Sequence, residues 1–292
     1  MSAQITGAIL DGILGGSVYA LMAAGLTLIF GVLDIINIAQ GILVVLGAYL
    51  SYVLSVHLGI DLFVGLAITV PAMFAVGVAI YWLFIRPLRG YERTAMSLLV
   101  TYAVAIIIEG ILYQVFGVNF VELQAWYVTA TVKVGGYYLP VIYLFAFAMS
   151  VVVLAVLWVV LYRTRFGRSI RATMQNRTAA RLVGIDTDRV AALCFGIGVA
   201  VTAFGAMIFG ATNSFNANSG YDLISRLLSI VILGGLGSVS GALGAALFMT
   251  TVEALVAVWN PNWATVVYYA ALIIVLTWRP EGLLGQRAAR AQ

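Results

Sequence analysis

The sequence predicts an all-α, polytopic membrane protein with about eight membrane segments, some of them broken or re-entrant. The first observation is compositional: 9% of the 292 residues are charged and 63% are hydrophobic. A soluble domain carries about 25% charged residues, so this chain has too little polar surface to cover a water-soluble globule. The second observation is that long apolar runs, each the length of a membrane-spanning helix, separate the charged residues.

Seven apolar runs contain no Asp, Glu, Lys or Arg, and a helix needs roughly 20 apolar residues to cross the hydrocarbon core. They cover residues 12–33, 35–60, 62–85, 134–162, 190–221, 227–252 and 254–278. Residues 96–116 form an eighth segment if Glu109 is tolerated inside it. The runs are continuously apolar rather than alternating, so helices are predicted rather than barrel strands. No basic residue precedes Arg86, so the first segment is expected to be a retained helix.

The basic residues predict the orientation, because Lys and Arg are enriched in cytoplasmic loops. They form three clusters: Arg86, Arg89 and Arg93; seven arginines within 163–189; and Arg279, Arg287 and Arg290. We expect all three clusters, and therefore the C-terminus, on the cytoplasmic side. The net charge of +4 does not indicate a nucleic-acid partner, because these arginines flank membrane segments.

The clusters give a topology for the middle of the chain. Residues 96–116 are expected to cross outward, 141–162 inward and 190–211 outward again. The segment between the first two contains "YVTATVKVGGYYLP", whose alternation and paired glycines favour a small β-hairpin outside the membrane. The polar, turn-rich stretch 212–222 is expected to be a second outer loop.

Two segments are expected to interrupt membrane helices: "GVLDIINIAQG" (31–41) and "GGLGSVSG" (234–241). Residues 223–278 are too few for three full spans, so one full span and two shorter pieces are expected there. If 31–41 is re-entrant, the N-terminus lies inside; otherwise it lies outside. A similar interruption in each half is typical of a duplicated transporter fold with a central path, although chance similarity between glycine-rich helices explains it equally well.

Polar side chains at these interruptions are candidates for a translocation path. They are Asn37, Gln40, Ser238 and Ser240. Unpaired backbone groups inside a membrane need a wet or protein-lined setting, so these side chains either face a solute or satisfy the local backbone. Among the carboxylates in membrane segments, Asp34 is expected to cap a helix N-terminus. For Glu109 and Glu253, a structural hydrogen bond is favoured over a place on the path.

The sequence lacks the motifs of ATP hydrolysis and metal catalysis. It has no GxxxxGK[ST] loop, no HExxH, one cysteine and one histidine. We therefore expect neither an enzyme nor a cofactor. The stretch "NRTAARLVGIDTDR" (176–189) favours a short amphipathic helix with Gly184 at its C-terminal cap. Such a helix suits docking into a groove of a partner protein; a solvated loop held at lipid phosphates is the alternative.

Three long stretches resemble one known family. "TAARLVG" (178–184) is similar to the coupling motif of ABC importer permeases, which has two alanines, three further residues and a glycine. The surrounding "GRSIRATMQNRTAARLVGIDTDRVAALCFGIGVAVTAFGAM" resembles the permeases of branched-chain amino acid ABC importers. So do "GGSVYALMAAGLTLIFGVLDIINIAQGILVVLGAYLS" and "LLSIVILGGLGSVSGALGAALFMTTVEAL". The resemblance runs in order from about residue 15 to the C-terminal region.

The resemblance implies a single transmembrane permease domain (1–292) in a bacterial inner membrane, with a cytoplasmic coupling loop at 163–189. The implied coupling residues are Thr178, Ala179, Ala180, Leu182, Gly184 and Ile185. The implied partners are two ABC ATPase subunits, a second homologous permease as a hetero- or homodimer, an extracytoplasmic solute-binding protein and membrane lipid.

One residue departs from the family pattern and leaves the substrate open. Relatives often carry "NFAHG" where this chain has "NIAQG", so Gln40 replaces a histidine. Branched-chain amino acids, urea, amides and organic acids all remain candidate substrates. From the residues alone, a self-sufficient secondary transporter or channel is the alternative function.

Overall fold

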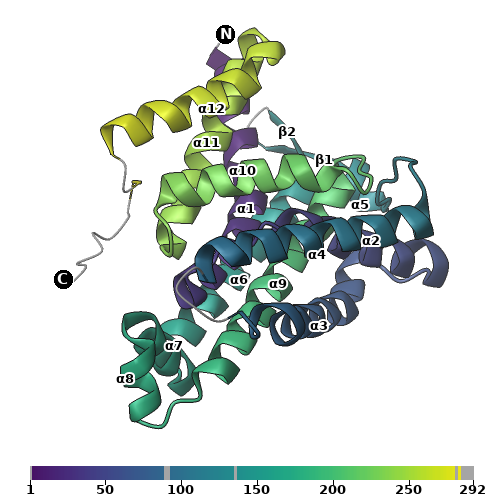
Figure 1. Cartoon of the computed structure of the whole chain (residues 1–292). Coiled ribbons are helices and arrows are strands. Elements are labelled where there is room, and N and C mark those ends of the chain that lie inside the picture. Colours follow the sequence, from purple (N-terminus) through teal and green to yellow (C-terminus); the bar gives the residue numbers. More distant parts are fainter. Residues whose placement is uncertain (1, 89–92, 135–136, 280–281, 284–292) are drawn as a thin grey trace.

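The computed structural model describes residues 2–88, 93–134, 137–279 and 282–283, and it is almost entirely helical (Figure 1). Within these residues, 8 helices are long and apolar enough to cross a membrane. They are Gln4–Leu33, Gln40–Leu58, Leu62–Ile85, Thr94–Phe116, Val141–Arg163, Thr187–Thr212, Val239–Trp259 and Pro261–Trp278. The prediction of an all-α membrane protein with about eight segments is therefore confirmed.

The elements follow the chain as a series of long helices joined by short connections. The first half contains α1 (Ser2–Leu33), α2 (Gln40–Leu58), α3 (Leu62–Ile80), the π-helical turn η1 (Tyr81–Ile85), α4 (Arg93–Phe116), α5 (Trp126–Thr129), β1 (Thr131–Val134) and β2 (Tyr137–Pro140). The second half contains α6 (Val141–Arg163), α7 (Arg165–Gln175), α8 (Arg177–Leu182), α9 (Thr187–Thr212), α10 (Ser219–Gly234), α11 (Val239–Trp259) and α12 (Pro261–Trp278).

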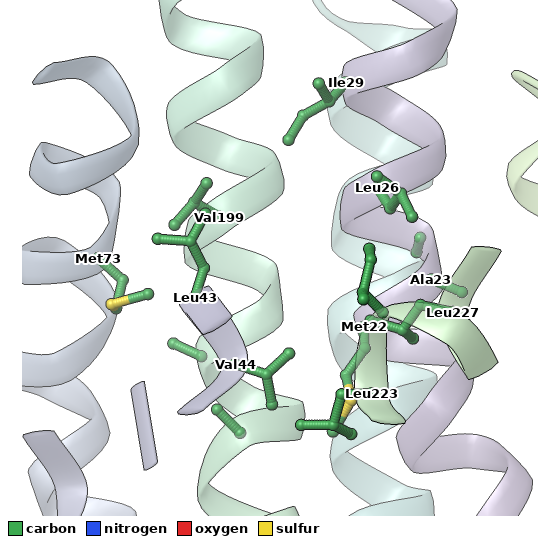
Figure 2. Packing of buried hydrophobic residues seen from close by; sticks show 14 of the residues in the cluster. Met22, Ala23, Leu26, Ile29, Leu43, Val44, Met73, Val199, Leu223 and Leu227 are labelled. Atoms are coloured by element: carbon green, nitrogen blue, oxygen red, sulfur yellow. The ribbon is translucent and has the colours of Figure 1, made fainter. Parts of the chain in front are cut away.

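Helices α1 and α9 form the centre of the molecule. They cross backbone to backbone at Gly25 and Gly198, where a Cβ atom on Gly198 would lie 2.7 Å from the Gly25 carbonyl oxygen. Small residues allow this close approach, which increases van der Waals contact between the helices. Such contact matters in a membrane, because lipid is as apolar as the side chains and no hydrophobic force drives helices together. Side chains of α1, α2, α3, α9 and α10 pack around the crossing, among them Met22, Leu43 and Val199 (Figure 2).

The contacts of α1 also fix its direction. Near its C-terminal end, Gly31 lies beside Met174 of α7, whereas Gly12 near its N-terminal end lies against Thr251 on α11. The N-terminal end of α1 is therefore at the opposite end of the bundle from the arginine segment (163–189).

The first interruption lies between α1 and α2, as the sequence predicts. Asp34 has a left-handed backbone (φ 57°), and its N–H donates to the Phe30 carbonyl at 2.8 Å. The prediction that Asp34 caps a helix N-terminus is wrong, because this residue terminates α1, and α2 begins six residues later at Gln40. Gly41 then packs against the backbone of Gly220, so the interruption sits directly beside α10.

The second interruption lies between α10 and α11, again where it is predicted. Gly235 and Gly237 both have positive φ (94° and 83°), which most other residues resist. The prediction of one full span and two shorter pieces is only partly correct. Helix α10 has 16 residues, whereas α11 and α12 have 21 and 18 and both qualify as spans.

The hairpin prediction is confirmed, with β1 and β2 pairing antiparallel. The outer loop 212–222 is shorter than expected, because its last four residues form the first turn of α10. An isolated bridge between Val121 and Phe215 joins this loop to the segment before the hairpin. Arg89, Arg287 and Arg290, which contribute to the predicted basic clusters, lie outside the described residues.

Candidate functional site

The first interruption carries a buried row of polar side chains. Asn37 donates to the amide oxygen of Gln40 at 3.0 Å, and Gln40 donates to the Thr202 hydroxyl at 2.5 Å. All three side chains are fully buried, and Thr202 belongs to α9 beside the Gly25–Gly198 crossing. The Asn37 amide oxygen has no hydrogen-bond partner among the described residues. The structure thus brings Asn37 and Gln40 together and adds Thr202, which the sequence analysis did not identify.

A second hydroxyl supports the non-helical backbone of this interruption. The N–H of Ile38 donates to the Thr101 hydroxyl of α4 at 3.2 Å, and that hydroxyl also lies 3.4 Å from the Ile36 carbonyl oxygen. Since water is scarce inside a membrane, an unwound segment must find such partners within the protein.

Ser238 and Ser240 occupy the second interruption and form a separate pair. The Ser238 hydroxyl accepts the N–H of Gly241 at 3.1 Å and so caps the start of α11. The two hydroxyls lie 3.4 Å apart, and Ser240 is exposed. The four residues predicted for the path are therefore two pairs, one buried against α9 and one at the beginning of α11.

The carboxylates on α4 and α11 differ in their partners. Glu253 on α11 accepts two hydrogen bonds from Arg226 on α10, at 2.7 and 2.8 Å, and the Arg226 guanidinium also faces the rings of Tyr19 and Tyr268. Glu109 on α4 instead accepts one hydrogen bond from the Tyr221 hydroxyl at 2.7 Å. The predicted structural hydrogen bond is present at both carboxylates, but only Glu253 has a counter-charge among the described residues.

At the hairpin end, a cavity of about 580 Å³ is lined by Glu122, Gln124, Trp126 and Thr129, together with Ala211 from the end of α9. Glu122 accepts hydrogen bonds from Gln124 and from Ser214, which lies beyond α9. Next to it, Tyr127 donates to Asp61 at 2.9 Å, and burial together with this hydrogen bond raises the pKa of Tyr127 above its usual value. No sequence motif indicated this cavity, which forms where residues 122–129 fold against the end of α9 at Ala211.

The arginine segment folds into two short helices, α7 and α8, at the other end of the bundle. The Asn176 side chain accepts the N–H of Ala179 and caps α8. Gly184 follows the helix with a φ of 85°, as expected for a C-terminal cap. Leu182 and Val183, at the end of α8, form an apolar edge that faces solvent. Their exposed fractions are 84% and 77%.

The predicted coupling residues divide between the two faces of α8 and the turn that follows. Thr178, Ala179, Leu182 and Gly184 are exposed, Ile185 is half-buried and Ala180 is buried. The exposed members can contact a partner protein directly, whereas Ala180 packs against the rest of this chain.

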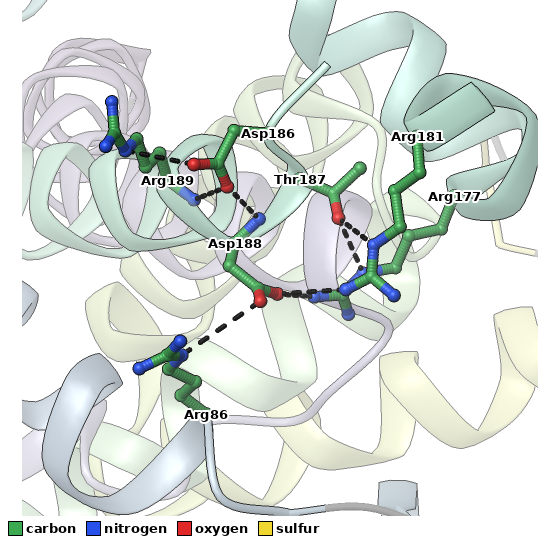
Figure 3. A network of polar contacts seen from close by, with 7 residues as sticks. All are labelled: Arg86, Arg177, Arg181, Asp186, Thr187, Asp188 and Arg189. Carbon is green, nitrogen blue, oxygen red and sulfur yellow. Dashed lines mark hydrogen bonds and ion pairs between the residues drawn. The ribbon is translucent and has the colours of Figure 1, made fainter. Parts of the chain in front are cut away.

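Asp188, at the start of α9, joins α8 to the membrane helices. Its carboxylate accepts hydrogen bonds from Arg177 at 2.7 Å and Arg181 at 3.2 Å, and it lies 4.0 Å from Arg86 after η1 (Figure 3). Thr187 receives further hydrogen bonds from the same two α8 arginines. The sequence analysis treated these arginines as orientation signals only; in the structure they fix α8 to α9.

The part of the chain that the structure describes combines eight helices of membrane-spanning length, two interruptions, a buried polar row and a polar segment at one end. This combination is typical of a polytopic membrane transport protein. Residues 8–276 match the family described as "Branched-chain amino acid transport system / permease component". The chain belongs to this family.

Three similar proteins illustrate the relationship. The high-affinity branched-chain amino acid transport system permease protein BraD of Pseudomonas aeruginosa is 28% identical, over 95% of each chain. The corresponding protein LivH of Escherichia coli K12 is 30% identical, over 94% of each chain. LivM of Escherichia coli K12 is 29% identical over 49% of this chain and 34% of its own length.

A solved structure supports the fold. The structure titled "PsaBC from Streptococcus pneumoniae in complex with Fab" contains a chain with a TM-score of 0.51 and 11% identity, covering 94% of this chain and 95% of that one. At this identity the likeness concerns the fold alone.

Proposed function

We propose that this chain is the membrane-spanning permease subunit of an ABC importer for branched-chain amino acids or related small polar solutes. The family match over residues 8–276 carries the proposal, and relatives along nearly the whole chain are named as branched-chain amino acid permeases. The chain itself performs no chemistry in this proposal. It supplies the path, and separate ATPase subunits supply the energy.

The proposed complex contains two ABC ATPase subunits, a second homologous permease and an extracytoplasmic solute-binding protein. Similarity to both LivH and LivM supports a second permease. The exposed apolar edge formed by Leu182 and Val183 supports the ATPase contact, because apolar side chains of this kind suit burial in a groove of a partner protein. Residues 163–189 would then be the cytoplasmic coupling loop of a single permease domain spanning 1–292.

Reconstitution tests this function directly. The chain is co-expressed with its candidate partner permease, ATPases and binding protein, and the purified complex is placed in proteoliposomes. We expect uptake of radiolabelled L-leucine that requires both ATP and the binding protein. Uptake by the chain alone, without ATPase subunits, would instead support the secondary transporter.

Orientation is tested by thiol labelling. The protein is a multi-pass membrane protein, and we propose an inner-membrane location with the arginine segment and the C-terminus in the cytoplasm. Gln175→Cys, exposed at the end of α7, should react with a membrane-impermeant maleimide only in inside-out vesicles. Thr129→Cys, exposed at the hairpin end, is the matched control and should react in intact cells. The native Cys194 is buried and should stay unlabelled. Labelling of Gln175→Cys from outside would contradict the topology.

We propose that the solute passes the two interruptions, touching Asn37 and Gln40 at the first and Ser238 and Ser240 at the second. Ser240→Trp should then abolish leucine uptake while the complex still assembles, because Ser240 is exposed and a larger side chain displaces no packed neighbour. Val258→Trp, exposed near the far end of α11, is the control and should transport normally. Normal uptake by Ser240→Trp would remove the second interruption from the path.

A further inference from the structure

Glu109 is a carboxylate in a membrane helix without a counter-charge among the residues that the structure describes. Glu253 differs, since Arg226 holds it with two hydrogen bonds. Tyr221 gives Glu109 one hydrogen bond at 2.7 Å, whereas an ionised carboxylate has about four acceptor sites. Ionisable groups inside a membrane are costly, and they usually pair or mark a substrate pathway.

Glu109 lies at a small, mostly apolar cavity with room for one small group. Glu109 and Tyr221 line a cavity of about 20 Å³, whose other walls include Ile38, Ile42, Ala105 and Ile224. About 10–15 Å³ is enough to hold one water molecule, and an ammonium group is of similar size. The carboxylate of Glu109 and the hydroxyl of Tyr221 thus lie at one end of the cavity, and mostly apolar side chains form its other walls.

The cavity is also placed at the proposed path. Ile38 belongs to the first interruption, directly after Asn37, and Ile42 lies in the first turn of α2 after Gln40. Tyr221 is 45% exposed, so the pair can be reached from outside this chain. A solute passing the interruption would meet the Glu109 carboxylate beside branched aliphatic side chains.

We infer that Glu109, oriented by Tyr221, binds the ammonium group of an α-amino acid as it passes the first interruption. This inference rests on the proposed function and narrows its substrate class. An amino acid supplies a cation that none of the described residues places beside Glu109. Urea and amides can donate N–H hydrogen bonds to this carboxylate but cannot compensate its charge, and an anionic organic acid would be repelled by it.

The first test compares charge-changing variants in the complete reconstituted importer. Hydrogen bonds to charged groups contribute about 1.5–3 kcal/mol, so Glu109→Gln should lower L-leucine uptake by about 10- to 100-fold. ATP hydrolysis stimulated by the loaded binding protein should persist, because the binding protein is expected to contact the importer at a surface separate from this cavity. Glu109→Asp should recover part of the uptake, and Tyr221→Phe should mainly raise the KM. Asp222→Asn, an exposed carboxylate beside Tyr221, is the matched control and should behave as wild type.

The second test measures whether the Glu109 site is occupied in the wild-type importer. It therefore does not depend on whether a variant folds. A hydrophobic carbodiimide should modify Glu109, as detected by peptide mass spectrometry. L-Leucine and 3-methylbutylamine should protect it, because both carry the ammonium group. 4-Methylpentanoate, which has the same branched chain and no ammonium, should not protect it.

The outcomes separate the inference from the proposed function. Wild-type leucine uptake by Glu109→Gln would overturn the inference, and so would equal protection by 4-methylpentanoate. Both results leave the importer function intact. If the wild-type importer transports urea or an organic acid and no amino acid, the proposed substrate class fails and the inference falls with it.

Discussion

Ala179→Glu is expected to abolish the stimulation of ATP hydrolysis by loaded binding protein, or to release the ATPase subunits during purification. Ala179 lies on the exposed side of α8 beside the apolar edge formed by Leu182 and Val183. A glutamate there would be buried unpaired at the proposed ATPase contact, at a cost on the order of several kcal/mol. Membrane insertion should be unaffected, because α8 lies outside the spanning helices.

The control for this variant adds the same charge nearby. Gln175→Glu places a carboxylate at an exposed position of α7, only four residues earlier in the sequence, and should keep stimulated hydrolysis. Gly184→Leu is a second test, because a φ of 85° strains a residue that carries a Cβ atom. If Ala179→Glu and Gly184→Leu both behave as wild type, α8 is not the coupling element.

Arg226→Met is expected to destabilise the protein by about 3–5 kcal/mol, because it leaves the Glu253 carboxylate uncompensated inside the membrane region. The pair is shielded, with side chains 23% and 21% exposed, and it ties α10 to α11. The loss should appear as a lower midpoint of thermal unfolding in detergent. The double variant Arg226→Met/Glu253→Met should recover most of it, since two apolar side chains replace both charges.

An exposed ion pair provides the matched comparison. Arg189 and Asp186 lie 2.9 Å apart, but their side chains are 78% and 55% exposed. Arg189→Met should therefore change stability by only about 0–1 kcal/mol. Equal losses for Arg226→Met and Arg189→Met would show that the Arg226–Glu253 pair contributes no more than a surface contact.

Sequence patterns predicted the helices and both interruptions because these depend on local chemistry. Apolar runs of spanning length require helices, and the glycines of 234–241 allow positive φ where α10 ends. The error at Asp34 has a local cause too: a carboxylate near a helix break is expected at the N-terminus of the next helix. In the structure α1 ends at a residue with left-handed backbone, and Asp34 is that residue. It therefore does not cap the N-terminus of α2.

The partners of the polar residues could not be predicted, because they come from distant parts of the chain. Gln40 meets Thr202 across 162 positions, and Tyr221 meets Glu109 across 112. The sequence identified Gln40 and Glu109 as unusual and gave no means of choosing their partners. Each of these contacts depends on how α9 and α10 pack against the first half of the chain.

The crossing of α1 and α9 at Gly25 and Gly198 has a mechanical consequence. Two backbones in direct contact have no side chain between them that can change rotamer and absorb a displacement. Sliding one helix along the other would drive larger neighbours such as Ile29 into the opposing backbone, so the pair is suited to move as one rigid body. The ladder of helical hydrogen bonds is instead interrupted at residues 34–39 and 235–238. Any change between states open to opposite sides of the membrane would therefore move α1 and α9 together.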